Sequence, residues 1–178
     1  VYISTNEVFN GHADRPYTEE DKPQPVTPYG SSKRTGEQMA AHYLRSGGLY
    51  IVRTAWLYGG GNKFPAKIIA AADEQGQLRV VTDEVSNPTY SLDLARAVAQ
   101  LVKTREYGIY HLVNSGYCSR YEFAQEILRL SGREDISLQP IILAEFQRAS
   151  TVPPFTPLAN GRGAALGIEL RPWQAALE

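Results

Sequence analysis

The sequence of 178 residues contains little of what marks several large classes of protein. It has a single cysteine, Cys118, so it can form no internal disulfide, and this fits a reducing compartment such as the cytoplasm. Its net charge is only −1, whereas nucleic-acid-binding surfaces carry clustered basic side chains. No run approaches the roughly 18 apolar residues of a membrane helix, and no signal peptide is visible. These absences predict a cytoplasmic globular protein without nucleic-acid or membrane partners.

Two further absences concern the start of the chain and its cofactor chemistry. The sequence begins without methionine in Val1-Tyr2-Ile3-Ser4, a pattern that predicts a buried strand, so we expect a fragment or a processed form of a longer protein. The sequence contains no glycine-rich turn of the kind that follows a strand and places a dinucleotide pyrophosphate on a helix N-terminus. Gly59-Gly60-Gly61 is interpreted as an ordinary loop. The histidines His12, His42 and His111 show no ligand spacing, so we expect no metal site.

What the sequence does contain is an alternation of strand and helix patterns. Runs rich in β-branched and aromatic residues predict strands over residues 1–4, 49–57, 78–82 and 109–113. Apolar spacing, with Thr27, Ser91 and Ser119 as N-caps, predicts a helix from residue 28 that is stopped by Gly47-Gly48, and helices over residues 64–74, 92–104 and 120–131. Two short helices are expected around residues 159–166 and 172–177. In the first of these helices we expect a core-facing side formed by Met39, Ala40, Tyr43 and Leu44.

The order of these elements predicts an α/β fold. Strands that alternate with helices indicate βαβ units, and therefore part of a Rossmann-type parallel sheet flanked by helices. The proline-rich residues 10–28 predict a long loop. The pattern degrades after Ile136, where Pro153-Pro154 and Pro157 mark extended chain, so the last third is expected to form a smaller lobe beside the sheet.

Tyr29 is the only one of the eleven tyrosines with a lysine four residues further on, Lys33. On a helix these positions share a face, so a phenol and an ammonium would meet at one pocket, as an acid and the cation that stabilises its ionised form. Thr5, just past a predicted strand, could bind the same substrate oxygen, because open α/β folds bind ligands at strand ends. The alternatives are a surface helix on which the pair merely packs, and a β-branched residue that ends a strand.

Several ordered motifs support the catalytic interpretation. They are Ser4-Thr5-Asn6-Glu7-Val8-Phe9, Pro28-Tyr29-Gly30 with Lys33 and Gly36-Glu37, Val52-Arg53-Thr54-Ala55-Trp56-Leu57-Tyr58-Gly59, Asn87-Pro88-Thr89-Tyr90 before Asp93-Leu94-Ala95, Gly108-Ile109-Tyr110-His111-Leu112, and Gly167-Ile168 with Arg171-Pro172-Trp173. With these motifs the chain resembles, nearly end to end, the extended short-chain dehydrogenase/reductases, and among them the dTDP-4-dehydrorhamnose reductase family.

The resemblance implies a role for each candidate residue. Tyr29 would donate a proton to the carbonyl that receives hydride, Lys33 would bind the nicotinamide ribose, and Thr5 would orient the carbonyl. Tyr29 and Lys33 would thus contact the cofactor, and Thr5, Asn6, Glu7 and Trp56 the substrate. Where the family commonly has Asp-Tyr, this chain has Asn6-Glu7. Arg53 could reach a substrate phosphate or serve equally well as an internal ion-pair partner.

The same resemblance implies the activity of a longer protein. That activity is the NADPH- or NADH-dependent reduction of the 4-keto group of a dTDP-4-dehydro-6-deoxy sugar in dTDP-L-rhamnose biosynthesis. This chain would be the C-terminal portion, in which residues 1–60 and 90–115 form the sheet and catalytic part and residues 62–88 and 116–178 a substrate-binding lobe. Without the N-terminal dinucleotide-binding part, we expect weak cofactor binding, little activity and an uncovered sheet edge. The protein could form a homodimer, and the sequence does not decide its oligomeric state.

Several alternatives remain at this point. An epimerase or dehydratase of the same superfamily would share the catalytic core, and a non-catalytic regulatory subunit of the methionine adenosyltransferase type would share the fold. Asp83 and Glu84 suggest either a metal site or, as we expect, a solvated turn. Cys118 is either a reactive thiol or, as we expect, a small packed side chain. His111 is expected to be packed and hydrogen-bonded rather than catalytic.

Overall fold

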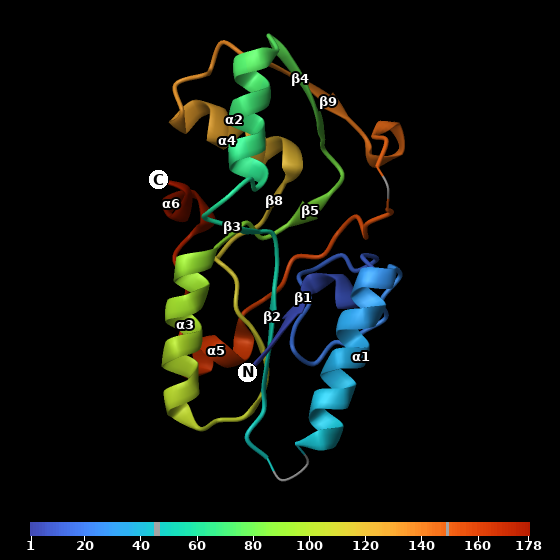
Figure 1. Cartoon of the computed structure of the whole chain (residues 1–178), viewed down its shortest axis with the longest axis vertical. Coiled ribbons are helices and arrows are strands. Elements are labelled where there is room, and N and C mark those ends of the chain that lie inside the picture. Colours follow the sequence, from blue (N-terminus) through green and yellow to red (C-terminus); the bar gives the residue numbers. More distant parts are fainter. Residues whose placement is uncertain (45–46, 149) are drawn as a thin grey trace.

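The structure is a computed structural model that describes residues 1–44, 47–148 and 150–178. It is elongated, with two groups of elements at opposite ends (Figure 1). One end holds the main sheet, α1 and α3, and the other holds α2, α4 and the β4–β9 pair. None of the helices in these described ranges is long and apolar enough to cross a membrane.

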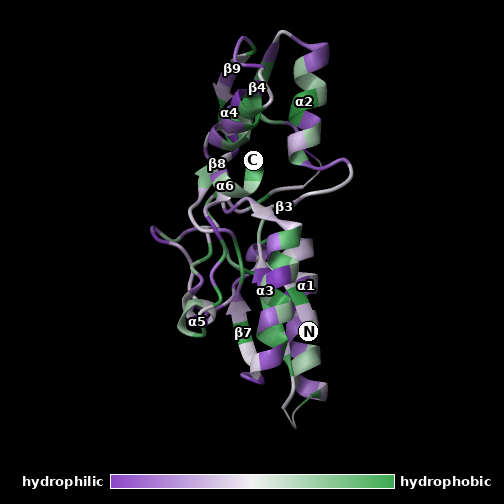
Figure 2. Ribbon diagram, turned by 90° about the vertical axis from the view of Figure 1, so that its left-hand side faces the viewer, coloured by the Kyte–Doolittle hydropathy of each residue, from purple (hydrophilic) through white to green (hydrophobic). Residues whose placement is uncertain are grey.

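The main sheet contains three parallel strands in the order β1-β2-β7, with β1 Tyr2–Thr5, β2 Tyr50–Thr54 and β7 Gly108–His111. All residues of the central strand β2 are buried. The prediction of a Rossmann-type parallel sheet flanked by helices is therefore confirmed. Helices α1 and α3 lie to one side of the sheet and α5 (Gly161–Ala165) to the other (Figure 2). Leu94, Ala97 and Leu101 of α3 (Ser91–Thr104) pack with β2 and β7 in the largest apolar cluster.

Helix α1 (Pro28–Tyr43) begins as predicted, because the Thr27 side chain accepts a hydrogen bond from Gly30 N. It packs closely on β1 and on the short helix η1 (Asn6–Val8), and a Cβ at Gly30 or Gly36 would collide with Glu7 or Tyr2. Only a residue without a side chain allows this approach.

The prediction that Met39, Tyr43 and Leu44 face a core is wrong. They are 53%, 76% and 46% exposed, and Ala40 is half-buried. The helix face toward the sheet is occupied instead by small and charged residues, among which Gly30 and Glu37 are buried. Apolar identity alone therefore did not indicate the buried face of this helix.

At the other end, α2 (Phe64–Glu74) and α4 (Arg120–Leu130) pack on a two-stranded parallel sheet of β4 (Gln77–Val81) and β9 (Ser137–Ile141). The Ser119–Glu122 capping box at the start of α4 is confirmed. Strand β9 was missed by the sequence analysis. It buries little besides Ile141 and contains Pro140, so its sequence lacks the alternation that marks a strand.

Short elements connect the two ends of the molecule. Strand β3 (Leu57–Tyr58) pairs with β6 (Thr89–Tyr90), and β5 (Val85–Ser86) pairs with β8 (Cys118–Ser119). The remaining elements are η2 (Leu143–Glu145) and α6 (Trp173–Leu177). The predicted cap of α3 is wrong, because Tyr90 occupies the N-cap position and Ser91 donates instead to the carbonyl of Gly59.

Candidate active site

A cavity of about 390 Å³ opens where β1 and β2 end. Thr5, Asn6 and Glu7 line it from the end of β1 and from η1, Tyr29 and Lys33 line it from α1, and Trp56 lines it from the segment after β2. All but one of the residues predicted for the site thus line this cavity, which is called the Tyr29 cavity. Its place at the carboxyl ends of parallel strands is where open α/β folds bind ligands.

Tyr29 and Lys33 lie one helical turn apart on α1, and both line the Tyr29 cavity. The phenol is half exposed, so a ligand can reach it. Lys33 Nζ donates to the Ile3 carbonyl oxygen at 3.1 Å and lies 5.5 Å from the centre of the Tyr2 ring. An ammonium group has three donors, so this anchoring to β1 leaves two of them for a ligand.

Thr5 and Asn6 are buried on the floor of the cavity. The Thr5 hydroxyl donates to Asn6 Oδ1 at 3.2 Å and accepts from Glu7 N at 3.3 Å. The Asn6 amide donates to the side chains of Ser86 and Thr156 at 3.1 and 2.7 Å, which uses both of its hydrogens. Asn6 therefore ties the cavity to distant parts of the chain, and its side-chain donors are not available to a substrate.

Glu7 connects the cavity to the start of α1. Its Oε2 accepts from the Thr27 hydroxyl at 3.1 Å, and the same hydroxyl caps α1 by accepting from Gly30 N. Burial raises the pKa of the Glu7 carboxyl, although the Thr27 hydrogen bond opposes this shift. Glu84 also raises that pKa, while Arg148 and Arg120 lower it, so charges beyond the cavity influence Glu7.

Trp56 forms one wall of the cavity and has an unusual backbone, with φ at 38°. A bulky side chain rarely adopts this left-handed region, and such a residue costs on the order of 1–3 kcal/mol. The Arg120 guanidinium lies 3.5 Å from the centre of the Trp56 ring and 4.9 Å from that of Phe64. The indole of this residue, whose backbone is strained, is thus held by a cation stacked on its face.

Arg53 is the predicted site residue that the structure does not place in the cavity. It is 1% exposed, and its Nε and Nη2 donate to Glu37 Oε1 and Oε2 at 2.8 and 2.9 Å. Its guanidinium therefore cannot reach a substrate phosphate, and the ion-pair alternative holds. His111, at 0% exposure, is packed beside this pair as predicted, with its ring hydrogen-bonded.

A second cavity, of about 510 Å³, lies between α2, β4 and α4 and was not predicted from the sequence. This basic cavity is lined by the cations Lys63, Lys67, Arg79, Arg120 and Arg148, by one acid, Glu84, and by apolar side chains that include Phe64, Ile68 and Phe146. The Lys63–Lys67 spacing at the start of α2 was the only local signal for it, because the arginines come from segments far apart in the chain. Stacking of Arg120 on Trp56 joins the basic cavity to the Tyr29 cavity.

The prediction of a solvated turn at Asp83-Glu84 is wrong for Glu84, which is 5% exposed. Its Oε1 accepts from Arg120 Nη2 at 2.9 Å and its Oε2 from Arg148 Nη1 at 2.7 Å. Asp83 is exposed and accepts from Leu143 N. Among the residues that the structure describes, no group of three or more His, Cys, Asp or Glu side chains is arranged to hold a metal ion.

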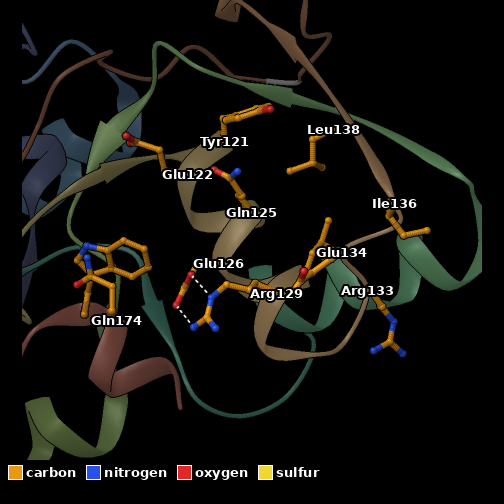
Figure 3. Close-up of a pocket in the computed structure, with 12 residues that line it drawn as sticks. Tyr121, Glu122, Gln125, Glu126, Arg129, Arg133, Glu134, Ile136, Leu138 and Gln174 are labelled. Atoms are coloured by element: carbon orange, nitrogen blue, oxygen red, sulfur yellow. Dashed lines mark hydrogen bonds and ion pairs between the residues drawn. The ribbon is translucent and has the colours of Figure 1, made fainter.

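A third cavity, of about 650 Å³, is lined by residues of α4, of β9 and of the start of α6 (Figure 3). Its charges are largely paired within the protein, Glu126 with Arg129 at 2.6 Å and Arg133 with Asp73 at 2.7 Å. Such pairs leave few charged groups to recognise a ligand, so this cavity is not the candidate site.

Several known proteins are similar to this chain in sequence and in structure. The chain is 41% identical over 178 residues to the spore coat polysaccharide biosynthesis protein SpsK of Bacillus subtilis, covering 99% of this chain and 62% of the relative. The crystal structure of a dTDP-4-dehydrorhamnose reductase from Clostridium acetobutylicum superposes with a TM-score of 0.92 at 38% identity, covering 99% of this chain and 62% of that one. The crystal structure of the dTDP-4-dehydrorhamnose reductase of Bacillus anthracis in complex with NADP superposes with a TM-score of 0.91 at 33% identity. This match covers 99% of this chain and 62% of that one.

The chain therefore spans a little over three fifths of the length of these relatives. The expectation that it is part of a longer protein of the reductase family is confirmed. A family model described as the RmlD substrate binding domain matches residues 1–178, and the chain belongs to that family.

Proposed function

We propose that the full-length protein reduces the 4-keto group of a dTDP-4-dehydro-6-deoxy sugar with NADPH or NADH. The observation that carries this proposal is the Tyr29 cavity, where a phenol, an ammonium group and a hydroxyl meet at the carboxyl ends of parallel strands. Tyr29 would protonate the carbonyl oxygen, and Lys33 would stabilise the phenolate that remains. The Thr5 hydroxyl, which here donates to Asn6 Oδ1, would turn its hydrogen to the carbonyl oxygen and so orient it.

The residues present fit a nicotinamide cofactor at one point. Lys33 keeps two donors free at the cavity, and these suit the hydroxyls of the nicotinamide ribose. When bound, the nicotinamide ring supplies the hydride. No glycine-rich pyrophosphate turn occurs in the sequence, so we expect the chain alone to bind the dinucleotide weakly. The relative of known structure from Bacillus anthracis is a complex with NADP, which supports this choice of cofactor for the full-length protein.

The two adjoining cavities suit the two halves of a nucleotide sugar. The Tyr29 cavity, with Glu7 and Trp56, would take the sugar. The basic cavity has five cations against one acid, which suits a diphosphate, and the rings of Phe64 and Phe146 can pack against a base. This supports a substrate-binding lobe that contains residues 62–88 and the first part of residues 116–178, beside a catalytic part of residues 1–60 and 90–115. The end of the proposed lobe differs, because α5 packs on β7 and Ile168 and Leu170 lie in the apolar cluster of the main sheet.

Turnover by the full-length protein tests the proposal. Incubation with NADPH and dTDP-4-dehydro-6-deoxy-L-mannose should consume cofactor and yield one reduced sugar per NADPH oxidised. An epimerase would convert the sugar without net consumption of NADPH, and a regulatory subunit would convert nothing, so either result would contradict the proposal. Cytoplasmic location and a homodimer stay predictions.

A further inference from the structure

Glu84 is a buried acid between two cations. Its carboxylate is bound by Arg120 through Nε at 3.1 Å and Nη2 at 2.9 Å, both to Oε1. The other oxygen, Oε2, is bound by Arg148 Nη1 at 2.7 Å. Glu84 follows β4, Arg120 begins α4, and Arg148 lies after η2, so this single carboxylate joins three segments of the chain.

Arg120 links Glu84 to Trp56, which lines the Tyr29 cavity. Its side chain is only 19% exposed, and its guanidinium is stacked on Trp56 while it is bound by Glu84. Because the Trp56 backbone is strained, the indole keeps its place only if its surroundings hold it there. Arg120 is the cation on its face, and Glu84 directs that cation.

Arg148 is less confined, with 31% of its side chain exposed. It lines the basic cavity, and within residues 1–44, 47–148 and 150–178 its one ion pair is the pair with Glu84. The carboxylate therefore places one arginine against Trp56 and holds the other at the rim of the basic cavity.

We propose that Glu84 is a positioning residue of the nucleotide-sugar site, which builds the wall shared by the two cavities by holding Arg120 flat on Trp56 and Arg148 toward the diphosphate. This inference rests on the proposed function. Glu84 itself would not touch the sugar or the reacting atoms. Its role is to fix the direction of two guanidinium groups that would otherwise repel each other and turn toward solvent.

Positioning and simple charge predict opposite results for the same substitution. If Glu84 acted only through its charge, its neutralisation would make the basic cavity more positive and strengthen the binding of an anion. If Glu84 positions the arginines, its neutralisation releases them and weakens binding, because a preorganised site then has to be ordered by the ligand.

The test compares Glu84→Gln with Glu145→Gln in the full-length protein. Glu145 is a matched control because it pairs with Arg79 of the basic cavity at 3.5 Å, is half exposed, and has no contact with Arg120 in the described part of the chain. Calorimetry with thymidine diphosphate should show an affinity about tenfold lower for Glu84→Gln. For Glu145→Gln the affinity should be unchanged or slightly higher. Equal behaviour of the two variants, or tighter binding by Glu84→Gln, would overturn the inference.

A second readout needs no ligand. In the 178-residue chain with Trp173→Phe, Trp56 is the single tryptophan, and acrylamide should quench its fluorescence more strongly in Glu84→Gln but not in Glu145→Gln. If Glu84→Gln fails to fold, Arg120→Lys keeps the charge but loses the planar stack, and it should show the same increase. Unchanged quenching in the folded variants would contradict the positioning role.

The failure of the proposed function would look different. An unaltered protein that neither bound thymidine diphosphate nor reduced any nucleotide sugar would overturn the proposed function and this inference together. Normal binding by the unaltered protein, with the two Gln variants alike, would overturn this inference alone.

Discussion

Glu37 of α1 and Arg53 of β2 form a two-point ion pair inside the protein, with N–O distances of 2.8 and 2.9 Å and 1% exposure for each residue. Glu37 follows Tyr29 and Lys33 at intervals of four residues, so all three share one face of the helix. Ser4 of β1 also donates to Glu37, at 2.6 Å. The pair therefore fixes the rotation of α1 relative to the sheet, and with it the direction of the candidate catalytic groups.

Replacement of Arg53 by Met should lower the free energy of unfolding by up to about 3–5 kcal/mol. It leaves the buried Glu37 carboxylate with only the partly exposed Arg34, at 2.9 Å, and Ser4 as partners. Urea unfolding of the chain, followed by circular dichroism, measures this. The control is Arg129→Met, which removes an exposed pair with Glu126 and should cost about 1 kcal/mol or less. Equal losses in the two variants would contradict the structural role of the Glu37–Arg53 pair.

His111 should make the protein sensitive to mild acid. Burial lowers the pKa of its ring to about 4, and Glu19 opposes this shift. The ring Nδ1 lies 3.1 Å from the Tyr17 carbonyl and Nε2 lies 3.5 Å from Arg53 Nη1, so a neutral ring with its hydrogen on Nδ1 satisfies both.

The sign of the pH effect follows from this shift. Between pH 6.5 and pH 4 the unfolded chain binds a proton at His111 that the folded chain does not, so stability falls as the pH falls through this window. The expected loss is on the order of 3 kcal/mol. Urea unfolding of the chain at several pH values measures it, and His111→Gln should flatten the curve between pH 6.5 and 4. An unchanged slope in that variant would contradict the assignment.

Replacement of Tyr29 by Phe in the full-length protein should remove the proton donor of the proposed reduction. We expect kcat to fall by about 10²–10⁴ while KM changes little, because only the transition state loses an interaction. Steady-state oxidation of NADPH measures this. Tyr43→Phe makes the same change on the same helix at a position that is 76% exposed, and it should leave kcat unaltered. A Tyr29→Phe protein with normal turnover would exclude Tyr29 as the acid.

Cys118 should be unreactive in the folded protein. Burial raises the pKa of its thiol far above the ordinary value, and Glu122 adds to this shift, so the nucleophilic thiolate is scarce. A thiol reagent such as 5,5′-dithiobis(2-nitrobenzoic acid) should react only after denaturation. Fast reaction of the native protein would support the reactive-thiol alternative instead.

Local patterns predicted much of the fold correctly. Helix α2 has the predicted limits, and the Thr27 and Ser119 caps were found because a cap and its helix lie within a few residues of each other. Strand β9 was missed because it is a strand only through its partner β4, about sixty residues earlier in the chain. The prediction of the buried face of α1 was wrong, because that face depends on the strand against which the helix packs.

The sequence by itself determined that Tyr29 and Lys33 share a helix face and that Thr5 ends a strand, because helical spacing and the end of a strand are local properties. It also determined the alternation of strands and helices that gives a parallel sheet. Only the tertiary structure decided which charges are paired inside. Arg53 reaches Glu37 across 16 positions, and Glu84 reaches Arg120 across 36 and Arg148 across 64. A charge has the same identity in the sequence whether it faces water or a buried partner, and its role depends on which distant segment folds against it.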